Sequence, residues 1–137
     1  RVSIQANYPV EEYANDVNII FQCPVEISSA SCELPPSVQD TQSSQFNSKT
    51  RQVTWSIKKF VGLQEFSGRF RFIFDNGIPC KPESIIGPIS LQFTHIGRLI
   101  SGMSIKNFVV STSGSQQQPK RWLKEMTTAA CYTFNFI

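Results

Sequence analysis

The sequence predicts a nearly all-β domain built from elongated, β-sandwich-type sheets, and three observations carry this prediction. Apolar and polar residues alternate in seven separate segments, aromatic residues are abundant, and turn-forming residues interrupt the chain at short intervals. The 137 residues include eleven Phe, three Tyr and two Trp, whereas only 17% are charged. Alternation places one side of a strand in a core and the other in water, and aromatic residues favour strands. Many short strands between turns are typical of a sandwich.

Each of the seven alternating segments predicts one strand. In chain order, their apolar positions are Val2, Ile4, Ala6 and Tyr8; Val17, Ile19, Phe21 and Cys23; Val53, Trp55 and Ile57; Phe70, Phe72 and Phe74; Ile89, Leu91 and Phe93; Met103, Ile105, Phe108 and Val110; and Tyr132, Phe134 and Phe136. The sixth segment changes face midway, which predicts a bulge. The chain begins inside the first segment and without Met, which suggests a piece of a longer protein.

Turn-forming residues separate these strands. The turn signals are Pro24, Pro35-Pro36, Asp75-Asn76-Gly77, Pro79, Pro82, Gly87-Pro88 and Ser113-Gly114. The Ser- and Gln-rich stretches 37–48 and 113–119 predict mobile loops. No segment of ten or more residues shows a clear 3.6-residue period, and the best helix candidate is 120–128. No apolar run approaches the ~18 residues that a membrane-spanning helix requires.

The residue inventory argues against an enzyme, a cofactor and a metal site. His95 is the single histidine, and its place in a strand pattern predicts a surface or packed residue rather than a catalyst. The four cysteines, Cys23, Cys32, Cys80 and Cys131, contain no C-x-x-C pair for zinc. Four cysteines could form two disulfides, but Cys23 and Cys131 lie in apolar segments, where a free thiol packs as a small hydrophobe, so we favour reduced thiols of a cytosolic protein.

Charge is unevenly distributed along the chain. The first forty residues hold six acids and one base, and the rest hold twelve bases and four acids, so a −5 segment precedes a +8 segment. One interpretation is a basic face for anionic lipid, acidic protein or nucleic acid. In the other interpretation, which we favour, these charges are spread over the outer faces of several strands and form no single patch.

Two segments combine cations with an aromatic residue. Residues 120–124 surround Trp122 with three cations, and Trp is enriched in binding hot spots. A core position for Trp122 is an equally good interpretation. In the second segment, Trp55 falls on the predicted buried face, which leaves Lys58 and Lys59 exposed as a possible contact for anionic lipid.

Five motifs stand in a fixed order between residues 50 and 137. They are Val53-Thr54-Trp55-Ser56-Ile57-Lys58-Lys59-Phe60-Val61-Gly62-Leu63-Gln64-Glu65; Gly87-Pro88-Ile89-Ser90-Leu91-Gln92-Phe93; Ser101-Gly102-Met103-Ser104-Ile105 followed by Phe108-Val109-Val110; Arg121-Trp122-Leu123-Lys124; and Cys131-Tyr132-Thr133-Phe134. In order and spacing they resemble the mu homology domain, the cargo-binding C-terminal part of the medium subunits of clathrin adaptor complexes. Residues 1–25 fit that domain more loosely.

The resemblance implies an elongated all-β domain of two subdomains, one inserted in the other. Residues 1–137 would be its C-terminal part, with about 1–100 mainly in the inserted subdomain and about 101–137 closing the first. The implied function is non-catalytic recognition of sorting signals by β-strand addition next to Trp122. Trp122 would pack beside the cargo side chains, Leu123 would offer backbone hydrogen bonds and an apolar contact, and Lys124 would face the signal's tyrosine.

The implied partners are cytosolic tails of membrane cargo with tyrosine-based signals, other adaptor subunits and a phosphoinositide membrane surface, but not nucleic acid. The implied location is cytoplasmic and peripheral, on coated vesicles at the Golgi, endosome or plasma membrane. Lys124 stands where the family usually has Arg, whose planar group stacks better on an aromatic ring. An endocytic interaction scaffold of the same fold, similar to the stonins or muniscins, therefore stays open as an alternative, as does a polyanion-binding β domain.

Overall fold

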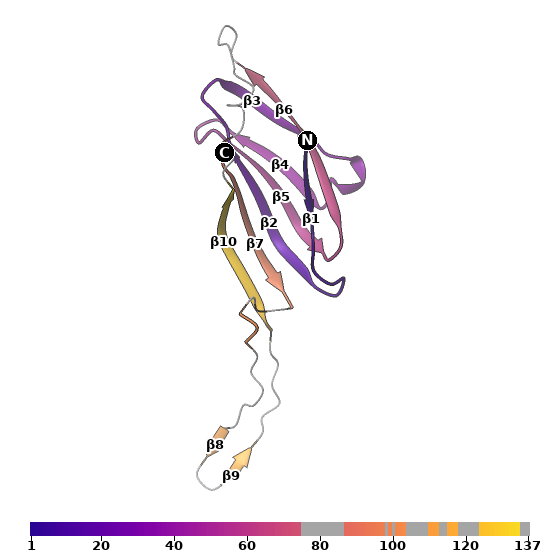
Figure 1. The fold of residues 1–137 in the computed structure, drawn as a ribbon, viewed down its shortest axis with the longest axis vertical. Helices are drawn as coiled ribbons and strands as arrows, with labels where there is room; N and C mark the ends of the chain where they lie inside the picture. Colours follow the sequence, from indigo (N-terminus) through magenta and orange to yellow (C-terminus); the bar gives the residue numbers. More distant parts are fainter. Residues whose placement is uncertain are drawn as a thin grey trace.

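The computed structural model describes residues 1–74, 87–97, 99, 101–103, 110–112, 115–117 and 124–134. The described elements are strands and one 3-10 turn, with no α-helix among them (Figure 1). They are β1 (Val2–Gln5), β2 (Tyr13–Gln22), β3 (Ile27–Glu33), η1 (Pro36–Val38), β4 (Gln42–Asn47), β5 (Gln52–Val61), β6 (Glu65–Phe74), β7 (Ile89–Ile96), β8 (Val110–Thr112), β9 (Ser115–Gln117) and β10 (Met126–Phe134). The all-β prediction is confirmed.

The strands form two main sheets, and every pairing is antiparallel. The larger sheet has the strand order β10-β7-β2-β5-β4 (Figure 1). In the smaller sheet, β6 pairs with β1 through Glu65–Gly68 and with β3 through Arg69–Phe74. Strands β8 and β9 form a separate hairpin. The division of the chain into an inserted and an enclosing subdomain stays a prediction.

Aromatic rings join the two sheets into a sandwich. The ring of Phe70 on β6 lies 4.8 Å from that of Phe21 on β2 and 5.9 Å from that of Trp55 on β5, centroid to centroid. Phe60 and Phe66 stack at 5.2 Å. These contacts follow from the alternation, because it directs the apolar side chains of β2, β5 and β6 toward one another.

The core is centred on β2 and β5. The most deeply buried large side chains are Trp55, Phe21, Ile27, Ile57 and Val53, all less than 2% exposed. The predicted burial of Trp55 with Val53 and Ile57 is therefore confirmed.

The predicted mobile loop at 37–48 is wrong for most of its length, because it contains η1 and the strand β4. Strand β4 pairs with β5 from Gln42 opposite Ile57 to Asn47 opposite Gln52. Gln42 is 4% exposed, and its Oε1 accepts a hydrogen bond of 3.1 Å from Trp55 Nε1. This bond satisfies the indole donor in the core, which explains why a glutamine occupies an inward position.

The C-terminal segments also differ from the sequence prediction. Residues 126–128, predicted at the end of a helix, belong to β10. Cys131 and Tyr132 lie on β10 yet are exposed, because this strand is the edge of the larger sheet and a register shift separates Ala129 from Tyr132. Met103 is exposed and lies outside the strands. The predicted turn at 75–77, and most of the predicted bulge between 103 and 110, lie outside the described residues.

Tyr8 connects the end of the first segment to β5. Its hydroxyl donates a hydrogen bond of 2.6 Å to the carbonyl oxygen of Phe60. Burial raises the pKa of the Tyr8 phenol above its usual value of 10.0, and the charge of Glu12 raises it further. Both effects disfavour the phenolate in the folded protein.

Replacement of Tyr8 with phenylalanine is expected to lower the free energy of unfolding by about 1 kcal/mol at neutral pH, because the Phe60 carbonyl loses its side-chain donor. The contribution of Tyr8 is complete below the unfolded-state pKa of about 10 and is lost as the pH rises through the higher folded-state pKa. Urea unfolding of both proteins at neutral pH and above pH 10 tests this. A difference between them that stays constant at both pH values would contradict it.

Candidate functional site

The site implied by the sequence, Trp122 to Lys124, precedes β10 in the chain. Trp122 and Leu123 are outside the described residues. Lys124 is described and exposed, two residues before the strand begins. The next residue, Glu125, accepts a hydrogen bond of 3.1 Å from the backbone N–H of Gly97, which follows β7. This bond holds the beginning of the β10 segment against the end of β7.

Strand β10 is one of the two edges of the larger sheet (Figure 1). It pairs with β7 from Met126 opposite Ile96 to Phe134 opposite Ile89, and no strand of the described residues pairs with its other side. An edge strand presents a row of backbone N–H and C=O groups to which a further strand can add. The side chains of Met126 and Tyr132 are 46% and 62% exposed along this edge, so apolar surface accompanies the backbone groups.

Lys58 and Lys59 are both exposed, as predicted, but they do not form one cationic patch. The Lys58 ammonium donates to the backbone carbonyl of Asp40 at 3.0 Å. The Lys59 ammonium lies 4.4 Å from the centroid of the Tyr13 ring, at the distance of a cation–π contact. The contact with anionic lipid stays a prediction for both residues.

His95 is buried at the end of β7, where it packs among other side chains. Its Nε2 lies 3.2 Å from Glu12 Oε2, without the alignment of a hydrogen bond. Its ring meets that of Tyr8 edge to face, with the centroids 4.8 Å apart. The Tyr8 hydroxyl donates a hydrogen bond to the backbone carbonyl of Phe60. This hydroxyl is therefore engaged with the main chain and is not positioned as a nucleophile for His95 to activate.

The cysteines of the described part, Cys23, Cys32 and Cys131, are free thiols. Burial raises the pKa of Cys23 and of Cys32 above the usual value of 9.0, because a thiolate is poorly solvated there. Both are therefore neutral thiols at physiological pH, whereas the thiolate is the reactive form. Within the described residues, no three His, Cys, Asp or Glu side chains converge in a way that could hold a metal ion.

A groove of about 320 Å³ opens where β1 begins and β3 ends, and no motif in the sequence predicts it. Its lining residues are Arg1, Glu33, Leu34, Pro35, Ser67 and Arg69. Arg69 and Arg71 alternate with the Phe residues of β6 in the sequence, and both are exposed on the face of β6 opposite those Phe side chains. Their alternation was the available signal, but it does not show which other strands complete the groove.

The described residues contain no helix that is long and apolar enough to cross a bilayer.

Comparison with known proteins identifies the family. The model of the Adaptor complexes medium subunit family matches residues 1–136. The chain is 28% identical over 131 residues to the AP-4 complex subunit mu of Arabidopsis thaliana, an alignment that covers 96% of this chain and 29% of that protein. The chain thus spans less than a third of that relative's length. The resemblance to the mu homology domain is confirmed, and because the family match covers almost the whole chain, this protein belongs to the adaptor complexes medium subunit family.

Proposed function

We propose that this chain is a non-catalytic adaptor module in vesicle-mediated protein transport, and that it recognises sorting signals of membrane cargo by β-strand addition next to Trp122. Membership of the medium subunit family supports the adaptor role. The open edge of β10, which begins two residues after Lys124, supports the mode of binding. That edge is the observation on which the proposal mainly depends.

Strand addition provides affinity through main-chain hydrogen bonds and specificity through alternate side chains. In a Tyr-x-x-apolar signal, the tyrosine would lie beside Lys124, and the indole of Trp122 and the side chain of Leu123 would contact the apolar residue. The exposed Lys124 has a flexible ammonium group. It can attract the face of an aromatic ring, but it cannot stack on the ring as a guanidinium does.

This function places the chain at the cytoplasmic surface of coated vesicles, at the Golgi, endosome or plasma membrane, in contact with other adaptor subunits. Lys58 and Lys59 are the candidate contacts with phosphoinositide. Each is held by its own chain, Lys58 at the backbone carbonyl of Asp40 and Lys59 over the ring of Tyr13.

A labelled peptide with a Tyr-x-x-Leu signal tests the proposal. Trp122→Ala is expected to weaken its binding about tenfold or more, the size of effect typical of a Trp hot spot. Lys124→Arg is expected to strengthen binding, because arginine adds stacking on the tyrosine ring. Fluorescence anisotropy with the full chain measures both effects.

Lys49→Ala serves as the control, since this exposed residue follows the other edge strand, β4, and its removal should leave binding unchanged. The signal peptide with alanine in place of tyrosine should not bind. If Trp122→Ala and the original protein bind the peptide equally well, strand addition next to Trp122 is refuted. No binding of the tyrosine peptide to either protein or to Lys124→Arg would favour the scaffold function.

A further inference from the structure

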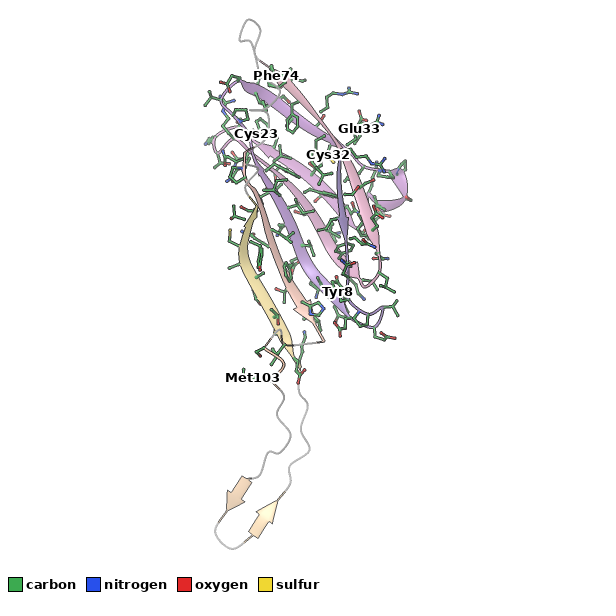
Figure 2. All side chains as sticks on the ribbon, in the orientation of Figure 1. Tyr8, Cys23, Cys32, Glu33, Phe74 and Met103 are labelled. Carbon is green, nitrogen blue, oxygen red and sulfur yellow. The ribbon has the colours of Figure 1, made fainter. Side chains whose placement is uncertain are left out.

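The groove at the junction of β1, β3 and β6 is built on the outer face of the smaller sheet. Strand alternation turns Phe66 and Phe70 of β6 toward the core and turns Ser67 and Arg69 outward. Glu33 is the last residue of β3, one position after Cys32 (Figure 2). The groove lies away from the β10 edge and uses none of its residues.

In the described part of the chain, the ion pair of Glu33 with Arg71 leaves Arg69 on this face without a carboxylate partner. In the register of β3 and β6, Glu33 lies directly opposite Arg69, where a cross-strand ion pair is expected. Its Oε1 instead accepts a hydrogen bond of 2.8 Å from Arg71 Nη2. Among the described residues, the guanidinium of Arg69 forms no ion pair.

Arg1 supplies a second guanidinium in the same groove. Its Nη2 donates a hydrogen bond of 3.0 Å to Ser67 Oγ, which leaves most of the five N–H donors of an arginine available. This bond also orients the arginine along the groove. With Glu33 balanced by Arg71, two uncompensated positive charges remain on the lining, Arg1 and Arg69.

The remaining wall of the groove is apolar. Leu34 and Pro35 follow β3 and line it beside the two arginines. A ligand that fits this surface carries a multiply charged oxyanion next to an apolar group. Two guanidinium groups and a hydroxyl provide donors in several directions, which suits the three terminal oxygens of a phosphate monoester better than the two of a carboxylate.

We propose that this groove binds a phosphorylated serine or threonine of a peptide segment, with the phosphate between Arg1 and Arg69 and a neighbouring apolar side chain against Leu34 and Pro35. Arginine clusters are the usual means of recognising phosphorylated peptides. A membrane surface fits less well, because Glu33 and Glu65 lie on the same outer face and would face the anionic lipid. The groove would give the adaptor a contact that a kinase controls.

The probe is a short, fluorescent Gly- and Ala-rich peptide with one phosphoserine followed by leucine. Arg69→Gln is expected to weaken its binding to the chain about tenfold or more, the size of effect expected for hydrogen bonds to a charged group. Lys49→Gln removes the same charge from the turn after β4 and is expected to leave binding unchanged apart from a small effect on the salt dependence.

Glu33 provides a second and more specific readout. Arg71→Gln releases the Glu33 carboxylate, which then lies opposite Arg69 and competes with the phosphate, so binding should weaken. Adding Glu33→Gln to that variant should restore it, and Glu33→Gln alone should strengthen binding about threefold. A scattered surface charge effect would give the same rescue, so Glu11→Gln in the Arg71→Gln background is the matched control. Glu11 is exposed and does not line the groove, and this variant has the same net charge as the rescue variant, but it leaves Glu33 free to compete and should not restore binding.

Circular dichroism of each variant separates loss of binding from loss of fold. Equal affinity for the phosphorylated and unphosphorylated peptides would overturn the proposal, as would equal weakening by Arg69→Gln and Lys49→Gln. Binding to phosphatidylcholine vesicles containing a phosphoinositide that depends on Arg69, without binding to the peptide, would assign the groove to a membrane and also overturn it.

Discussion

Trp55→Ala is expected to lower the free energy of unfolding by about 4 kcal/mol, at the upper range for large-to-small changes in a core. The Trp55 side chain is fully buried and packs against Phe70 of the opposite sheet. Its removal opens a cavity between the sheets and takes away the donor to Gln42 Oε1. The buried Gln42 amide would then have to be satisfied by water or leave the core.

Urea unfolding followed by circular dichroism measures this loss. Trp55→Phe is the matched variant, because it keeps an aromatic ring in contact with Phe70 but removes the indole N–H. We expect it to lose about 2 kcal/mol, from the lost hydrogen bond and the smaller ring. If Trp55→Ala does not fold, Trp55→Phe still provides a measurable value. A loss of less than about 1 kcal/mol for both variants would show that Trp55 is not the centre of the core.

The second large effect is expected at Gly62, where Gly62→Ala should lower the free energy of unfolding by about 3 kcal/mol. A Cβ atom at this position would lie 1.9 Å from the carbonyl oxygen of Pro9 and 2.4 Å from that of Tyr8. These are backbone atoms, and they are held in place by the hydrogen bonds of Gly62 N–H to Glu12 O and of Leu63 N–H to Ala6 O, both 3.0 Å. The clash therefore cannot be relieved by turning a side chain.

Leu63→Gly is the control for this prediction, since it changes the adjacent residue in the opposite sense. Leu63 has a φ of +63° and is 69% exposed. A left-handed backbone costs a non-glycine residue about 1–2 kcal/mol, so glycine here should leave stability unchanged or raise it by about 0.5 kcal/mol. Thermal or urea unfolding of the two variants should thus give clearly different results. If Gly62→Ala and Leu63→Gly lower the free energy of unfolding equally, the turn is sensitive to any substitution, and the clash of a Cβ atom at position 62 does not explain the loss.

Alternation predicted those parts of the fold in which one face of a strand is apolar. Phe21, Trp55 and Phe70 were all placed on inward faces, and they meet in the core. Strand β4 was missed because it is a polar edge strand, whose single inward glutamine is explained only by the indole that it contacts. Side-chain pattern alone does not reveal such a partner.

The candidate sites show a similar division. Ordered motifs were sufficient to identify the family, and alternation placed Lys58 and Lys59 in solvent. The contact of Lys59 with Tyr13 depends on the register between β2 and β5. The free guanidinium of Arg69 depends on the diagonal pairing of Glu33 with Arg71. Neither the register nor the choice of ion-pair partner can be obtained from the spacing of residues in one sequence.

The division of β6 between two partners has a consequence for how the molecule assembles. Strand β1 and strand β3 each cover only part of β6, and the Arg1–Ser67 bond joins residues 66 positions apart in the chain. Closing loops of that length is slow compared with forming a hairpin such as β4–β5. The arginine groove is therefore completed only when the N-terminal strand has docked on β6, and local unfolding of that strand would remove the groove while the larger sheet stays intact.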